Sequence, residues 1–157
     1  MEPILEIIPA LQRRKGFLGL GRETFSLILT PARLVFVPVT TQEMNDAVRA
    51  ARQQAKDQGK GFFGQWSAQL AWIGVLCQQY RATPLDALIA QHPGTFYVLN
   101  GQVTGIRLKD RLDQETNRTQ HEITIQSVGG KYRFELIGMP SGQARQIMKQ
   151  VLPHVVR

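Results

Sequence analysis

The stretch GRETFSLILTPARLVFVPV, residues 21–39, decides how the chain folds. Two runs rich in Leu, Ile, Val and Phe flank a short proline turn at residues 30–32, which predicts a strand, a tight turn and a second strand. Phe25, Leu27 and Leu29 share one face of the first strand. Apolar residues occupy both faces of the second strand, so we expect the sheet to be covered on both sides there.

Further strands are expected on both sides of this stretch. Residues 4–11, ILEIIPAL, predict a short strand broken by Pro9, and residues 13–21 predict a glycine-punctuated loop. Much later in the chain, FYVLN and QVTGIRLKD predict two strands joined by a hairpin turn at residues 100–101. Gly105 interrupts the alternation of the second of these strands, so we expect a β-bulge there.

The last part of the chain combines a hairpin with a helix. Residues 121–137, HEITIQSVGGKYRFELI, alternate apolar and polar positions on either side of two glycines, which predicts a hairpin. After Pro140, apolar residues recur at helical spacing, and we expect Ser141 to cap a terminal helix. The pattern predicts about seven strands in all.

Between the two groups of strands, residues 42–92 change to a helical period. Thr40 and Glu43 fit a capping box, because each side chain can bond a free backbone N–H at the start of a helix. A second helix is expected over Gln65–Tyr80, and a third over residues 83–92. We therefore predict a helical insertion over residues 42–92.

The insertion contains the least polar segment, since no charged residue occurs from Gly61 through Tyr80. Its helix spans only about 22 Å, less than the ~30 Å core of a bilayer, so we exclude a transmembrane segment. Three alternatives stay open: burial within the fold or a homo-oligomer, contact with a protein partner, and adsorption to a membrane surface. The residues expected to make this contact are Phe62, Phe63, Trp66 and Trp72.

Antiparallel strands, an inserted helical segment and a terminal helix indicate an α+β fold in one domain over residues 1–157. The expected architecture is a small antiparallel β-barrel or bent sheet closed by the C-terminal helix. The stretch at residues 21–39 and the later strands resemble the GRAM and bacterial pleckstrin-homology-like (PH-like) families, over roughly residues 1–40 and 95–152. The matching positions of the motif are Thr30, Arg33, Leu34 and Phe36.

This resemblance implies a binding or scaffolding module and not a catalyst. Phosphoinositide-binding pleckstrin domains resemble one another in a basic residue near the end of the first strand and a basic-x-Arg pair on the second. Residues 13–15, Arg-Arg-Lys, match the first feature, whereas residues 22–24, Arg-Glu-Thr, do not match the second. We expect contact with a protein partner or a second copy, with peripheral binding to an anionic membrane as the alternative.

The net charge of +7 calls for an explanation. The excess is spread along the chain, with two positive charges in residues 1–41, one in 42–92 and four in 93–157. If the late strands are neighbours, their outward residues form a cationic face that attracts a phosphate-rich surface. An ordinary solvated face is the other interpretation. The residues expected to contact an anion are Arg13, Arg14, Lys15, Arg107, Lys109 and Arg133.

Other classes of function have little support in the sequence. The three histidines lack metal-ligand spacing and a single cysteine cannot build a thiolate zinc site, so we predict no metal and no cofactor. No catalytic set can be nominated, and we predict that the protein is not an enzyme. Nucleic-acid binding is disfavoured because the cationic strands lack stacking aromatics. Cys77, interpreted as a reduced thiol, favours a cytoplasmic location, with membrane association as an option.

Overall fold

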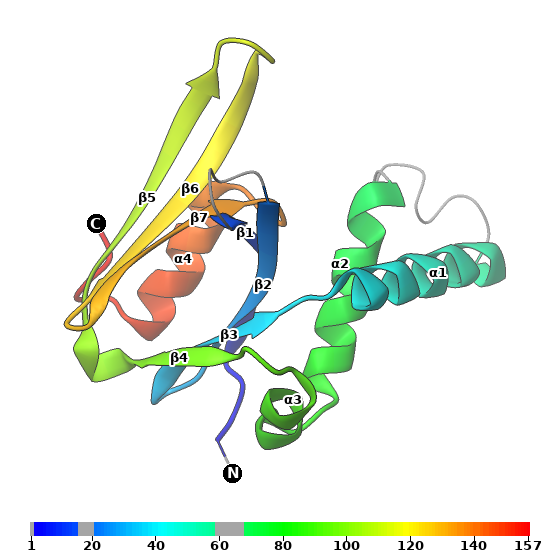
Figure 1. The fold of residues 1–157 in the computed structure, drawn as a ribbon, viewed down its shortest axis with the longest axis horizontal. Coiled ribbons are helices and arrows are strands. Elements are labelled where there is room, and N and C mark those ends of the chain that lie inside the picture. The colour runs from blue at the N-terminus through cyan, green and yellow to red at the C-terminus, as the bar shows by residue number, and fades with distance from the viewer. Residues whose placement is uncertain (1, 16–20, 59–67) are drawn as a thin grey trace.

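The computed structural model describes residues 2–15, 21–58 and 68–157, and its strands and helices form an α+β fold (Figure 1). The strands are β1 (Glu6–Lys15), β2 (Gly21–Leu29), β3 (Arg33–Pro38), β4 (Phe96–Leu99), β5 (Val103–Asp113), β6 (Arg118–Ser127) and β7 (Gly130–Leu136). The helices are α1 (Thr41–Gln58), α2 (Ala68–Arg81), α3 (Leu85–Gln91) and α4 (Ser141–Val151). The seven strands form one antiparallel sheet in the order β4-β3-β2-β1-β7-β6-β5.

The sheet is open, because β4 and β5 lie at its two edges and do not pair with each other. The hairpin predicted at residues 100–101 is therefore wrong. A single 3-10 turn, Asn100–Gln102, carries the chain from one edge to the other. Backbone bonds to two other turns hold it in place, from Asn100 N to Ala32 O in the β2–β3 turn (2.9 Å) and from Val128 N in the β6–β7 turn to Gln102 O (2.9 Å). The sheet curls until its edges approach each other at this turn.

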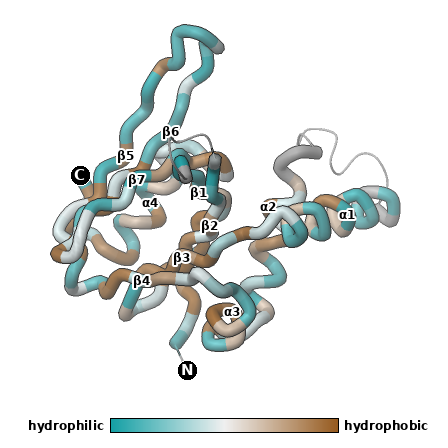
Figure 2. Tube along the Cα trace, in the orientation of Figure 1, coloured by the Kyte–Doolittle hydropathy of each residue, from teal (hydrophilic) through white to brown (hydrophobic). Residues whose placement is uncertain are grey.

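The inner face of this curled sheet encloses the main core. Leu27, Phe36 and Phe134 meet there with residues of every strand, and the rings of Phe36 and Phe134 are stacked 5.3 Å apart. Helix α4 lies against the same face and buries Ala144 and Met148 in the core. Figure 2 shows the hydrophobic residues concentrated along β1–β4 and in the part of β5–β7 that borders α4.

The outer face of β1–β3 carries a second core beneath the helical insertion. Ile28, Val35 and Val37 point to this side and pack against α2 and α3, which contribute Leu76 and Leu88. Figure 1 shows α1, α2 and α3 together on this side of the sheet. Both faces of β3 are therefore buried, one in each core, as the sequence pattern predicts.

Strand β1 differs from the prediction, because it continues past Pro9 and includes Arg13, Arg14 and Lys15. Its pairing with β2 shifts register between Ile8 and Leu11, so Pro9 and Ala10 form a bulge in a continuous strand. Ala10 has a φ of 58°. A bulge tolerates proline, since its residues need not donate to the ladder. The basic residues predicted to lie in a loop therefore belong to the sheet.

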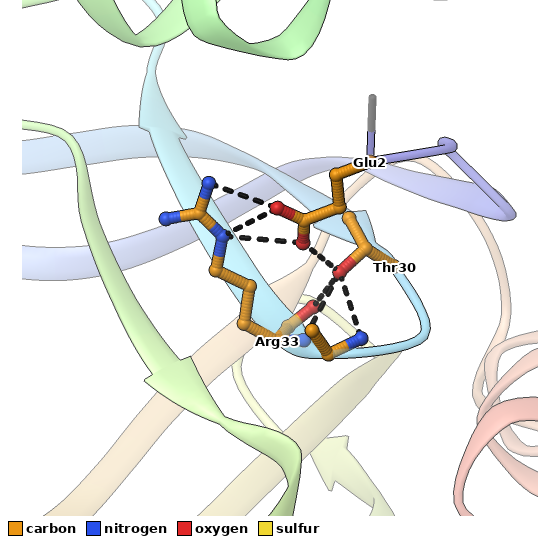
Figure 3. Close-up of polar contacts among 4 residues, drawn as sticks. Glu2, Thr30 and Arg33 are labelled. Atoms are coloured by element: carbon orange, nitrogen blue, oxygen red, sulfur yellow. Dashed lines mark hydrogen bonds and ion pairs between the residues drawn. The ribbon is translucent and has the colours of Figure 1, made fainter.

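The turn that links β2 and β3 owes its shape to Thr30. The buried hydroxyl of Thr30 accepts backbone N–H bonds from Ala32 (3.2 Å) and Arg33 (3.0 Å) and donates to Glu2 (Figure 3). The Arg33 side chain also pairs with Glu2 at 3.0 Å. Burial raises the pKa of Glu2, but hydrogen bonds from Thr30 and Arg33 outweigh it and lower the pKa overall. This cluster fastens the N-terminal segment to the turn.

Two of the predicted helix caps behave differently from each other. Thr40 Oγ1 accepts a bond from Glu43 N (3.1 Å), which is one half of the predicted capping box. The other half is wrong, because the Glu43 carboxylate bonds Tyr80 and His92 and not the backbone of Thr40. Ser141 is wrong as a cap: its hydroxyl makes no capping bond in α4 and donates to Asp110 on β5 at 2.5 Å. Because that bond joins α4 to the sheet, Ser141 fixes the position of the helix instead of its first turn.

Candidate functional site

The outer face of the sheet changes character between its two halves. On β1–β3 it is apolar and covered by helices, whereas on β5–β7 it is polar and no helix of the described chain covers it (Figure 1). Strand alternation explains the change, because Ile106 and Leu108 point into the core and the residues that alternate with them point outward. Those outward residues, Arg107 and Lys109, are exposed.

The register of the ladders arranges the outward residues in rows that cross three strands. One row joins Arg107, Thr124 and Arg133, so a threonine lies between two arginines. The next row towards the β6–β7 turn joins Gly105, Gln126 and Lys131. With about 4.8 Å between neighbouring strands, the outer members of a row are about 10 Å apart at their backbones. Arginine and lysine side chains reach across that distance to a shared anion.

Two hollows open on this face. The small hollow has a volume of about 130 Å³ and lies across β5, β6 and β7, next to the C-terminal segment. The large hollow has a volume of about 590 Å³ and lies between β6–β7 and the adjoining ends of β1 and β2. Lys131, Arg133 and Glu122 line both hollows, so the two form one continuous surface.

Folding concentrates the basic residues that the sequence spreads out. Nine of the 19 basic residues line the two hollows, against two of the 12 acidic residues, Glu122 and Glu135. We name as the cationic face the eight of these basic residues other than Arg13: Arg14, Arg22, Arg107, Lys109, Arg111, Lys131, Arg133 and Arg157. Together with the Glu122 and Glu135 side chains, the side chains of this face carry a net charge of +6.

Few of these cations are neutralised by carboxylates of the protein itself. Arg22 pairs with Glu135 at 3.2 Å, and Arg111 lies 3.9 Å from Glu122. Within the described residues, Arg107, Lys109, Lys131 and Arg133 have no carboxylate within ion-pair distance. Exposed cations that repel one another bind an external anion favourably, because its charge relieves their mutual repulsion.

The predicted anion contacts have three different outcomes. Arg14, Arg107, Lys109 and Arg133 line the hollows and come together on one face. Arg13 borders the large hollow, but its guanidinium pairs with Glu23 at 2.8 Å and lies 4.8 Å from the ring centre of Phe25 on the inner side. The Arg13 side chain therefore has a structural role within the protein and is not a free anion contact. Lys15 ends β1, and its side chain lies outside the described residues.

Several members of the cationic face were missed by the sequence prediction. Arg111 continues the alternation of Arg107 and Lys109, so strand parity alone would have added it. Arg157 carries no such signal. Its position depends on the C-terminal segment, which bridges to β5 through bonds from Ile106 N to Val155 O (2.8 Å) and from Arg157 N to Ile106 O (2.9 Å).

The predicted contact of the insertion falls mostly outside the described residues. Phe62, Phe63 and Trp66 lie there, and only Trp72 is described. Trp72 is half-buried and packs against the clusters that join α2 to α1 and to the sheet. Its neighbours Val75 and Leu76 on α2 are buried within the chain itself.

The fold brings together one serine, one aspartate and one histidine, but not in a catalytic order. Asp110 Oδ1 accepts bonds from Ser141 Oγ (2.5 Å) and His121 Nδ1 (2.7 Å). These bonds, first that from Ser141 and then that from His121, lower the pKa of Asp110. A serine nucleophile needs the histidine as its immediate partner, and here the carboxylate stands between them. The arrangement holds α4 on the β5–β6 hairpin.

The described part of the chain contains neither a cluster of metal-ligating side chains nor a membrane-spanning helix. Those residues contain no group of three or more His, Cys, Asp or Glu side chains placed to hold a metal ion. Among them, no helix has both the length and the apolar character needed to cross a membrane.

Comparisons with known proteins place the chain in no family. No family model and no curated protein matches it. Among solved structures, the C-terminal domain of an unknown protein from Leishmania infantum aligns with 97% of this chain and 85% of its own, at 10% identity and a TM-score of 0.48.

Proposed function

We propose that the protein is a non-enzymatic interaction module that binds an anionic membrane surface through its cationic face. The observation that carries this proposal is the concentration of charge: nine basic and two acidic residues line two hollows on the half of the outer face that no described helix covers. Cations near an anionic bilayer each contribute about 1 kcal/mol of attraction. Several of them acting together suffice for peripheral binding.

The PH-like architecture remains part of this proposal. An antiparallel sheet whose two edges approach at Asn100–Gln102, with a C-terminal helix against its inner face, supports the expected bent sheet and its helix. Residues from β1–β4 and from β5–α4 share one core, which supports a single domain with the insertion at 42–92. Such a module positions a binding surface and leaves chemistry to its partners.

A membrane fits the cationic face better than a nucleic acid does. Tyr132 and Phe134 alternate with Lys131 and Arg133, but both rings point inward and stack on Phe36. The face therefore offers bases no aromatic platform among its described residues. Val128, in the β6–β7 turn beside Lys131, is 77% exposed. An exposed apolar tip beside cations suits the interface between lipid headgroups and acyl chains.

Contact through the insertion, by self-association or with a protein partner, stays a prediction because Phe62, Phe63 and Trp66 lie outside the described residues. The described part of α2 favours another role, since Val75 and Leu76 are buried within this chain. Neutralising two matched pairs of exposed residues distinguishes the two surfaces. Each pair contains one lysine and one arginine: Lys131 and Arg133 on β7, and Arg52 and Lys56 on α1.

We expect Lys131→Gln with Arg133→Gln to weaken sedimentation with phosphatidylcholine–phosphatidylserine vesicles by about 30-fold, from about 1 kcal/mol per cation. Arg52→Gln with Lys56→Gln removes the same charge and should leave binding unchanged. The opposite ranking would transfer the membrane contact to the insertion and refute the proposal.

A further inference from the structure

The shape of the small hollow depends on a β-bulge and a glycine, and the charge of the cationic face does not explain it. The ladder between β5 and β6 shifts register between Val103 and Gly105, so Thr104 is the extra residue of the predicted β-bulge. Immediately after the bulge, Gly105 faces outward opposite Gln126, and both residues line the hollow. The absence of a side chain at Gly105 leaves the space open between the rows of cations.

The space is open because residue 105 is a glycine, although the backbone there would accept a larger residue. A Cβ built at Gly105 would meet only the Gln126 Oε1 atom, at an ordinary contact distance of 3.5 Å. Gly105 also has none of the positive φ angles that demand glycine. The fold therefore tolerates a side chain at this position, and a glycine here preserves a hollow that a larger residue would fill.

The lining of the small hollow is strongly cationic. Arg107, Lys109, Lys131 and Arg133 come from β5 and β7, and Arg157 is added by the bonds that tie the C-terminal segment to Ile106. Thr124 and Gln126 supply neutral hydrogen-bonding groups between the cations. Glu122 is the one carboxylate side chain in the lining, and it lies 3.9 Å from Arg111. Such a lining favours a small ligand with more than one negative charge.

The size of the hollow limits what it can hold. At about 130 Å³ it has room for about four water molecules, and it is smaller than pockets that enclose whole drug-sized ligands. A single phosphate group fits these limits. A phosphate monoester carries close to two negative charges at neutral pH and three acceptor oxygens, which suit a ring of arginine and lysine donors.

We propose that the small hollow is a binding site for a doubly charged phosphate group. This inference rests on the proposed function and deepens it, because it assigns one defined subsite within the cationic face. The hollow takes its residues from β5, β6, β7 and the C-terminal segment, and none from β1 or β2. It is therefore separate from β1, where residues 13–15 match the first feature of the phosphoinositide-binding pattern.

Filling the hollow without changing its charge tests the proposal. In the wild type, inorganic phosphate should shift the backbone amide resonances of Gly105 and Gln126 in a saturable manner. We expect Gly105→Leu to weaken this binding by about tenfold or more, and Arg107→Gln by about fivefold. Arg118→Gln, at the far end of β6, removes an equal charge outside the hollow and should have no effect. If Gly105→Leu does not fold, Arg107→Gln still tests the proposal, because a substitution at this exposed position should leave the fold intact.

Vesicles distinguish the sources of the phosphate group. If the group belongs to a lipid, the wild type should bind phosphatidic acid vesicles more tightly than phosphatidylserine vesicles, and Gly105→Leu should remove the difference. If it belongs to a soluble molecule, only the titration with inorganic phosphate should respond to Gly105→Leu. Absence of saturable phosphate binding, or binding that neither Gly105→Leu nor Arg107→Gln weakens, would overturn the proposal. Phosphatidylserine binding reports on the proposed function separately.

Discussion

At the scale of single residues, polar side chains join segments that are far apart in the sequence. Glu43 of α1 accepts a bond from the Tyr80 hydroxyl of α2, and its other carboxylate oxygen lies 2.5 Å from His92 Nε2. His92 Nδ1 donates to Leu88 O of α3 at 2.7 Å. One carboxylate thus connects all three helices of the insertion. The capping pattern identifies Glu43 as a helix-start residue, but it cannot predict partners 37 and 49 residues away.

This cluster predicts how stability depends on pH. Burial, reinforced by the bond to Glu43, raises the pKa of Tyr80 in the folded state. Neutral Tyr80 therefore contributes its full stabilisation below about pH 10, the pKa of an unfolded tyrosine, and that contribution falls as pH rises further. Above pH ~10, the unfolding free energy of the wild type should fall more steeply than that of Tyr80→Phe, by up to about 1.4 kcal/mol per pH unit.

Urea denaturation at a series of alkaline pH values measures this difference. At neutral pH, Tyr80→Phe should cost about 1–3 kcal/mol, because the Glu43 carboxylate loses a donor. Tyr97→Phe, at an exposed position on β4, controls for the removal of a tyrosine hydroxyl. Parallel curves for the wild type and Tyr80→Phe above pH ~10 would contradict the assignment.

At the scale of elements, alternation and helical period predicted most of the strands and helices, whereas their connections depended on tertiary contacts. The β6–β7 hairpin and the bulge before Gly105 follow from local sequence. The turn at Asn100–Gln102 does not, because its bonds reach the segments at Ala32 and Val128. The same limit applies to β1, in which Pro9 forms part of a bulge that only its pairing with β2 reveals.

Helix α2 provides a test of how the insertion is packed. Gly74 is exposed and a Cβ built there has no neighbour within 4 Å, whereas the Leu76 side chain is buried against the sheet. We expect Gly74→Ala to stabilise the protein by about 1 kcal/mol through helix propensity. Leu76→Ala should destabilise it by about 2–5 kcal/mol. Thermal and urea denaturation measure both values, and a destabilising Gly74→Ala would indicate that this side of α2 is covered.

At the scale of the whole molecule, the distribution of charge is a product of the fold. No segment of the sequence is densely basic, yet the order β2-β1-β7-β6-β5 collects the eight basic residues of the cationic face on one side of the sheet: Arg14, Arg22, Arg107, Lys109, Arg111, Lys131, Arg133 and Arg157. The alternation of apolar and polar residues along the strands was enough to predict that Arg107, Lys109 and Arg133 lie together on the outer face. The presence of Arg14 and Arg157 on this face depends on the strand order and on the path of the C-terminal segment, which no local pattern contains.

The most direct test of the cationic face is the salt dependence of vesicle binding by the wild-type protein. Exposed charges are screened over about 8 Å at physiological ionic strength and over about 3 Å at 1 M salt. We predict sedimentation with vesicles of phosphatidylcholine and phosphatidylserine at low salt, progressive release as sodium chloride is added, and no sedimentation with phosphatidylcholine alone. Absence of binding at low salt, or binding that salt does not weaken, would contradict the account.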